Sequence, residues 1–139
     1  MSSKKHSALL RMMGALFAVL GISFIPPVII ALIYGEYFEG LCFGGTMAAC
    51  GIVGLILMKF FNPSDLKLKQ RDGFLIVSLI WIVSSIIGAV PMVLTGAIPN
   101  PFDAFFELCS GFSTTGATIM TDIESQAKSV LLWRSFTLW

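Results

Sequence analysis

Three long apolar runs without a charged residue constrain this chain more than any other feature. Met12–Ile33 and Phe74–Thr95 have 22 residues each, and Leu41–Met58 has 18. A helix needs about 20 apolar residues to cross the hydrocarbon core of a bilayer. Only 12% of the residues are charged, about half the share in a soluble domain. We therefore predict an all-α membrane protein with three transmembrane helices.

The first run resembles the core of a secretory signal peptide, because Lys4, Lys5 and Arg11 precede it. It is longer than the roughly 7–15 residues of such a core, however, and no small-residue cleavage site follows Ile33. We therefore interpret it as a retained membrane span.

Two further patterns concern the packing of the spans. Pro26 and Pro27, late in the first run, predict a bend or an early end of its regular helix. Small residues spaced four apart predict faces on which helices approach closely. These pairs are Gly14 and Ala18, Gly44 and Ala48, and Ser84 and Gly88.

The charges between the spans predict the orientation. The loop Tyr34–Gly40 contains Glu36 and Glu39 and no basic residue. The loop Lys59–Asp72 carries four basic residues, which are Lys59, Lys67, Lys69 and Arg71. Because positively charged flanks stay inside, we predict a cytoplasmic amino terminus and a cytoplasmic second loop. The chain after Thr95 then starts outside.

Several function classes are not supported by the sequence. A net charge of +1 provides no basic stripe for nucleic acid. There is no nucleophile–base set, Gly-rich phosphate loop or cluster of metal ligands, so we predict neither an enzyme nor a bound cofactor. The three cysteines have no CxxC spacing, and the two in apolar runs are typical of small buried hydrophobes.

A short helix is predicted after the third span. Asn100 is suited to the N-cap, Pro101 to the first helical position and Asp103 to the first turn. Apolar residues then recur at helical spacing, at Phe102, Phe105, Phe106 and Cys109. Gly111 is predicted to end the helix. A helix of 11 residues is about 16 Å long, roughly half the thickness of a bilayer core.

The residues that follow, Ser113–Thr118, contain no charge and no large side chain. Non-helical backbone at membrane depth must be buried by protein or line a water-filled cavity. A half-length helix followed by such a return is typical of a pore loop. The carboxyl end of the helix directs about half a negative charge at the loop, and extended Thr/Gly backbone can replace the water shell of a cation. Gly116 can adopt a positive φ, which such a backbone requires.

Four segments resemble a known family, the Trk/Ktr potassium transporters, and specifically their TrkH/TrkG membrane subunit. They are KQRDGFLIV at 69–77, DAFFE at 103–107, SGFSTTGAT at 110–118 and the helix start at 128–139 that contains WRSF. The two central segments resemble the first pore loop of the family. Together with the two preceding spans, the resemblance covers essentially the whole chain.

The resemblance implies a pore-forming subunit for potassium uptake across the bacterial inner membrane. It is built from four membrane–loop–membrane repeats and holds K⁺ by backbone carbonyls. The filter glycine of the family corresponds to Gly116, and Thr114 and Thr115 correspond to positions whose carbonyls face the ion. We predict a K⁺ site at Ser113, Thr114, Thr115, Gly116 and Ala117, with the ion held at Thr114 and Thr115. The implied partner is a cytosolic nucleotide-binding gating subunit similar to TrkA, besides membrane lipid and an oligomeric assembly.

We divide the chain into residues 1–72, an amino-terminal two-helix unit, and residues 73–139, a first repeat that is incomplete at its carboxyl end. Because one pore loop is present and the next helix stops after 12 residues, we expect a piece of a longer protein. A small subunit forming a homotetrameric cation pore is one alternative. The other is a non-conducting assembly or regulatory fragment, which a continuous helix from Phe102 to Met120 would favour.

Overall fold

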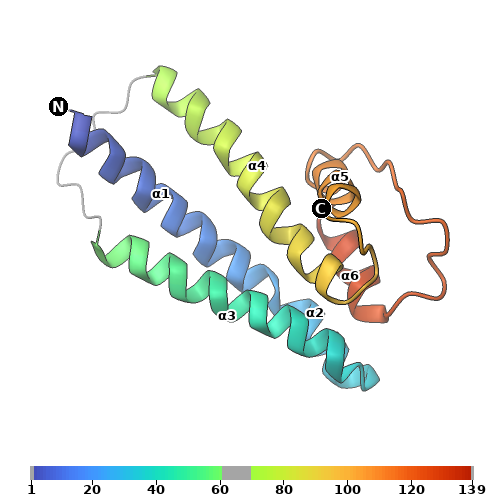
Figure 1. The fold of residues 1–139 in the computed structure, drawn as a ribbon. Coiled ribbons are helices and arrows are strands. Elements are labelled where there is room, and N and C mark those ends of the chain that lie inside the picture. Colours follow the sequence, from blue (N-terminus) through green and yellow to red (C-terminus); the bar gives the residue numbers. More distant parts are fainter. Residues whose placement is uncertain (1, 61–69, 139) are drawn as a thin grey trace.

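The computed structural model describes residues 2–60 and 70–138, with side chains from residues 9–60 and 73–138. Within these residues the regular structure is helical throughout, which confirms the predicted fold class (Figure 1). The helices are α1 (Ser2–Ser23), α2 (Ile25–Tyr34), α3 (Tyr37–Phe60), α4 (Gln70–Leu94), α5 (Pro101–Phe112) and α6 (Lys128–Phe136).

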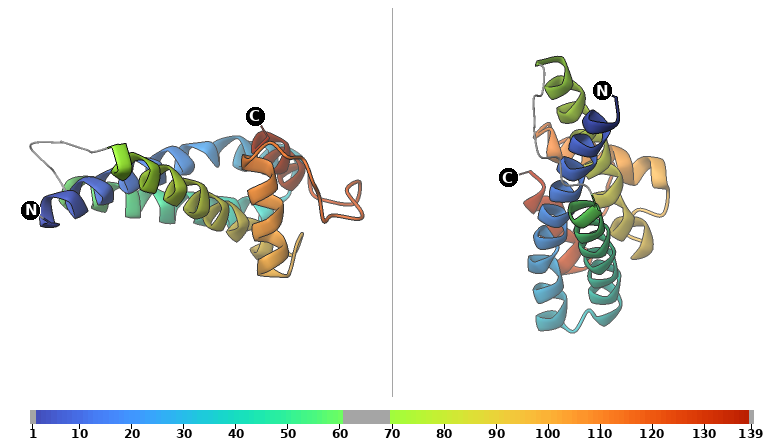
Figure 2. Two further views of the ribbon diagram at one scale, coloured as in Figure 1. Left: turned by 90° about the horizontal axis from the view of Figure 1, so that it is seen from above. Right: turned by 90° about the vertical axis from the view of Figure 1, so that its left-hand side faces the viewer.

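The three predicted spans are confirmed as long apolar helices. They comprise Leu9–Tyr34, Tyr37–Phe60 and Gly73–Leu94, with 26, 24 and 22 residues. Their most apolar stretches have mean hydropathies between 2.1 and 2.6. They lie side by side as a bundle, with α5 and α6 at one end of it (Figures 1 and 2).

The first span is broken at Phe24, as the two prolines predict. α1 ends at Ser23 and α2 begins at Ile25, with Pro26 and Pro27 in its first turn. Proline has no N–H to donate to the preceding turn, so the hydrogen-bond ladder is interrupted there. Phe24 itself is fully buried. The break therefore lies at a packed position in the protein.

Close packing of small residues is confirmed for two of the three predicted pairs. A Cβ added to Gly54 of α3 would lie 3.0 Å from the backbone nitrogen of Ala18 and from the carbonyl oxygen of Gly14. One added to Gly88 of α4 would lie 3.0 Å from Leu108 of α5. Gly44 has no such neighbour within 4 Å among the described residues, so close packing is not confirmed at that pair.

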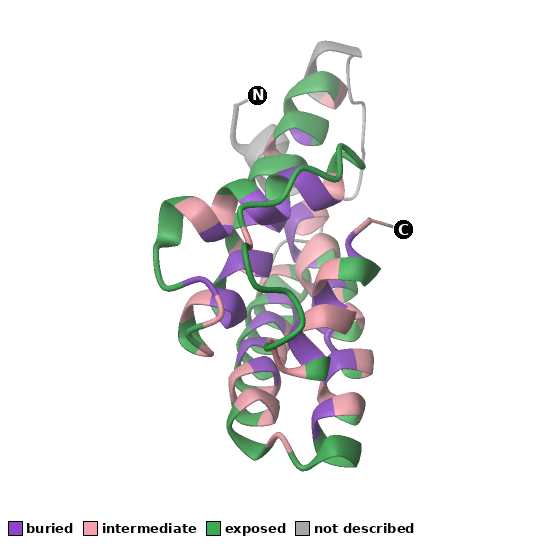
Figure 3. Cartoon of the chain, turned by 90° about the vertical axis from the view of Figure 1, so that its right-hand side faces the viewer, coloured by how far each residue is buried: buried purple, intermediate pink, exposed green. Residues whose placement is uncertain are grey.

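The hydrophobic core lies where the long helices meet α5 and α6. The ring of Trp133 is 4.4 Å from that of Phe24 and 6.3 Å from that of Phe43, measured between centroids. Met92 and Leu108 are also buried in this cluster. Figure 3 shows the buried residues and the exposed chain that follows α5. The core thus draws on residues from both predicted units, and the division at residue 72 remains a prediction.

Candidate ion-filter loop

The helix before the loop begins as predicted. Asn100 is the N-cap, and its side-chain oxygen accepts a hydrogen bond of 3.0 Å from the N–H of Phe102. Pro101 lies in the first turn, where its missing N–H costs no hydrogen bond. α5 has 12 residues and lies crosswise to the long helices (Figure 2).

The predicted end of this helix, at Gly111, lies one residue before the observed end, because α5 continues to Phe112. Gly111 is buried, and a Cβ added to it would lie 2.5 Å from the hydroxyl oxygen of Thr137 after α6. The glycine therefore permits close approach of another segment, and it does not terminate the helix. Sequence alone could not show this, because the contact joins residues 26 positions apart.

The apolar stripe predicted on α5 lies mainly on its exposed side. Phe102 is 83% exposed and Phe106 is 49% exposed. The buried side consists of small or polar residues together with one leucine: Ala104, Glu107, Leu108, Ser110 and Gly111. The polar ones, Glu107 and Ser110, are spaced three apart and both contact the chain that follows the helix. Two polar residues spaced three apart lie on one face of a helix, and this spacing is the sequence signal that would have indicated that both bind the following chain.

After Ser113 the chain turns back, and its backbone adopts positive φ at two positions. Gly116 has a φ of 74°, as predicted. Thr114 has a φ of 56°, which is rare for a residue branched at Cβ. Three successive N–H groups, of Thr114, Thr115 and Gly116, donate to carbonyls near the end of α5. The first donates to Gly111 and the other two to Ser110, at 2.9, 3.0 and 3.5 Å.

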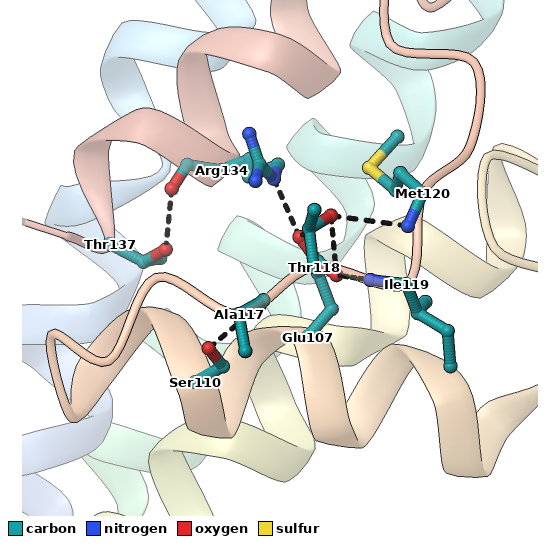
Figure 4. A network of polar contacts seen from close by, with 8 residues as sticks. All are labelled: Glu107, Ser110, Ala117, Thr118, Ile119, Met120, Arg134 and Thr137. Carbon is teal, nitrogen blue, oxygen red and sulfur yellow. Dashed lines mark hydrogen bonds and ion pairs between the residues drawn. The ribbon is translucent and has the colours of Figure 1, made fainter.

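The rest of the loop runs back along α5, as Figure 4 shows. The hydroxyl of Ser110 donates to the carbonyl oxygen of Ala117 at 2.7 Å. One turn earlier on the helix, Glu107 accepts from the hydroxyl of Thr118 at 3.0 Å and from the N–H of Ile119 at 2.8 Å. Going back along α5 from Ser110 to Glu107, the helix binds residues that lie successively later in the loop, from Ala117 to Ile119. The loop therefore doubles back along the helix.

Glu107 is the most buried charged group of this site. Its side chain is 2% exposed, and it forms an ion pair of 2.5 Å with Nε of Arg134 in α6. A buried carboxylate requires both a charge partner and hydrogen bonds to offset its desolvation, and this one has both. These two residues lie 27 positions apart in the chain. The structure brings them together and assigns Glu107 to holding the loop.

The five residues predicted to bind the ion form the exposed bend of this loop. The carbonyl oxygens of Ser113, Thr114, Thr115 and Gly116 accept no hydrogen bond from the described residues. The hydroxyls of Ser113 and Thr115 lie 2.9 Å apart and share a hydrogen bond. Ala117 differs, because its carbonyl is engaged by Ser110.

Comparison with known proteins identifies the family. Residues 42–139 match the TrkH family of cation transport proteins. The chain belongs to this family. TrkH proteins are transporters and not enzymes, so the predicted family and the predicted absence of an enzymatic activity are both confirmed.

Relatives include potassium-uptake proteins. The TrkH potassium uptake protein of Halomonas elongata is 34% identical over 135 residues, which are 94% of this chain and 27% of the relative. That of Escherichia coli is 35% identical over 134 residues, 95% of this chain and 27% of the relative. The chain thus spans between a quarter and a third of the length of these TrkH proteins.

A solved structure has the same fold. The crystal structure of the potassium transporter TrkH from Vibrio parahaemolyticus matches 99% of this chain and 29% of its own, at 32% sequence identity. The TM-score is 0.85. The chain is therefore a multi-pass membrane protein of the TrkH family.

Proposed function

We propose that residues 113–117 form one side of a potassium filter, in which K⁺ is held by backbone carbonyls of Thr114 and Thr115. One observation carries this proposal. The N–H groups of Thr114, Thr115 and Gly116 are bound to α5, whereas the carbonyls from Ser113 to Gly116 accept no hydrogen bond from the described residues. Carbonyls at membrane depth need a partner, and a dehydrated cation supplies one.

Two further points support a conducting pore. The carboxyl end of α5 leads directly into the loop, and the partial negative charge of that end favours a cation. The helix also ends at Phe112. The continuous helix to Met120, which would favour a non-conducting fragment, is not formed. The names of the relatives indicate potassium as the ion.

The assembly and partners are proposed from the family resemblance. Three further loops would complete the filter, and a TrkA-like nucleotide-binding subunit would gate it from the cytosol. The many exposed apolar side chains of α1 to α4 are suited to contact lipid or further membrane helices.

Growth at low potassium tests the proposal. In a strain that lacks its own potassium-uptake systems, the complete gene product should restore growth, and residues 1–139 expressed alone should not. One loop supplies only one side of a filter, whose ion needs carbonyls from several directions. Restored growth with residues 1–139 alone would instead favour four copies closing the pore together.

We further propose that the amino terminus and residues 59–72 lie in the cytoplasm of a bacterial inner membrane. Residues 34–40 and 122–125 would then lie outside. The residues from 61 to 69 fall outside the described part of the chain. A single cysteine at position 67 should react with an impermeant thiol reagent only after the membrane is opened, whereas one at position 124 should react in intact cells. Reaction at 67 in intact cells would reverse the orientation.

A further inference from the structure

We propose that Glu36, in the loop between the first and second spans, positions the filter loop by holding α6 in place. The inference rests on the filter role proposed above and gives the amino-terminal unit a part in it. Glu36 does not touch the loop itself, so it acts through α6, Arg134 and Glu107.

The carboxylate of Glu36 binds the amino terminus of α6, 92 residues further along the chain. Its two oxygens accept hydrogen bonds from the N–H of Lys128 at 2.6 Å and from the N–H of Ser129 at 3.0 Å. The hydroxyl of Ser129 adds a third, at 2.6 Å. The first N–H groups of a helix lack partners within the helix, and a negative charge is favourable beside them.

α6 has no cap of its own. Its N-cap residue is Ala127, which provides no side-chain hydrogen bond. Alanine is a poor residue at this position, where serine, threonine, aspartate and asparagine are preferred. Glu36 therefore supplies from the first outer loop the cap that the local sequence lacks, and this ties α6 to α2 and α3.

Glu36 remains ionised near neutral pH. Burial opposes its charge and by itself raises its pKa, but the hydrogen bonds from Ser129 and Lys128 and the charge of Lys128 outweigh burial, so the pKa lies below its ordinary value. Because the pKa is lowered, the contact stabilises the protein fully at pH values above the ordinary pKa of a glutamate. This stabilisation is lost as the pH falls through the lowered pKa. The carboxylate is thus charged at physiological pH, as an acceptor beside a helix N-terminus should be.

A second contact fixes α6 to the first span at its middle. The ring of Trp133 packs on Phe24, at the break between α1 and α2, and its Nε1–H donates to the carbonyl of Gly88 at 3.1 Å. Trp133 is only 1% exposed. With Glu36 at the start and Phe24 at the middle, α6 is held against the amino-terminal unit at two points.

From α6 the connection continues to the loop in two steps. Arg134 follows Trp133 directly and forms the ion pair with Glu107. Glu107 in turn binds Thr118 and Ile119, two and three residues after Gly116. A displacement of α6 therefore moves the group that holds the end of the filter loop. Glu36 and Phe24 act in this way as an anchor for the filter.

The test uses Glu36→Gln in the complete gene product, with Glu39→Gln as the control. Glu39 belongs to the same outer region but takes no part in the contact with α6. The first readout is the labelling rate of a single cysteine at position 119, in a background without the three native cysteines. Ile119 is 42% exposed, and its N–H is the group held by Glu107. The second readout is the ratio of potassium to sodium uptake.

Glu36→Gln removes one charged acceptor. We expect the labelling rate at position 119 to rise and the ratio of potassium to sodium uptake to fall, each by about threefold to tenfold, whereas Glu39→Gln should leave both unchanged. The double variant Glu36→Gln, Ala127→Asp distinguishes a role in capping α6 from a role in linking α6 to the outer loop, because it restores a local N-cap without restoring the link. If protein abundance returns to normal in the double variant while the labelling rate at position 119 stays raised, the inference is supported. Labelling that returns to the original rate would reduce Glu36 to a helix cap and overturn it.

Failure of this inference and failure of the proposed function are distinguishable. Unchanged labelling in Glu36→Gln overturns the inference, whatever the transport rates are. If the uptake ratio still responds to Gly116→Ser in that case, the filter role stands. If labelling rises while neither substitution changes the uptake ratio, Glu36 does position the loop, and the proposed filter role is wrong.

Discussion

Glu107→Ala should lower potassium uptake by the complete gene product at least tenfold. The substitution leaves the Arg134 guanidinium without its carboxylate and releases Thr118 and Ile119 from α5. Removal of one member of a buried ion pair costs about 3–5 kcal/mol. The Arg134 side chain is 20% exposed, so partial hydration places the cost near the lower end of this range.

Uptake measured at matched abundance in the membrane checks this expectation. Glu124→Ala is the control, because Glu124 is an exposed acid after the same loop. Glu107→Gln keeps an acceptor oxygen for the loop and should lose less activity than Glu107→Ala. A double-mutant cycle of Glu107→Gln with Arg134→Gln should show strong coupling. Equal effects of Glu107→Ala and Glu124→Ala would contradict the role of Glu107.

Gly116→Ser should lower the ratio of potassium to sodium uptake more than it lowers protein abundance. Gly116 has a φ of 74°, and a Cβ added there meets no atom within 4 Å among the described residues. The cost is therefore backbone strain, roughly 1–2 kcal/mol, and not a clash. Strain of that size is relieved by shifting the backbone, which displaces the carbonyls on both sides of residue 116.

Potassium and sodium fluxes at matched expression separate the possible roles of this glycine. Thr118→Ser is the control, because it removes one methyl group and keeps the hydroxyl that binds Glu107. If Gly116→Ser leaves both fluxes unchanged, the loop does not line the filter. Reduced abundance with an unaltered ratio would indicate a glycine needed only for folding.

Local patterns in the sequence predicted the parts of the fold that depend on neighbouring residues. The spans follow from uninterrupted apolar runs, and the start of α5 follows from Asn100 and Pro101, whose effect lies within one turn. The positive φ of Gly116 was predicted because glycine alone adopts it without strain. Thr114 shares the positive φ, but no propensity indicates it in a threonine.

The parts that could not be predicted depend on residues far apart in the chain. Gly111 was interpreted as a helix stop, which is a common local role of glycine. Its close contact with Thr137 becomes apparent only once the packing of α6 is known. The role of Glu36 was hidden for the same reason, since the helix that it caps begins 92 residues later. For Glu107, the sequence offered the helical spacing to Ser110 but not the burial that makes its ion pair strong.

The hydrogen bonds of the loop also bear on the sign of the charge that it can accept. An anion needs free donors, and the N–H groups of Thr114, Thr115 and Gly116 are already engaged by carbonyls of α5. The acceptors from Ser113 to Gly116 have no donor among the described residues, so this stretch of backbone offers only oxygen to an approaching ion. If residues 113–117 line the filter as proposed, the main chain from Ser113 to Gly116 therefore favours a cation over chloride without an acidic side chain within the loop.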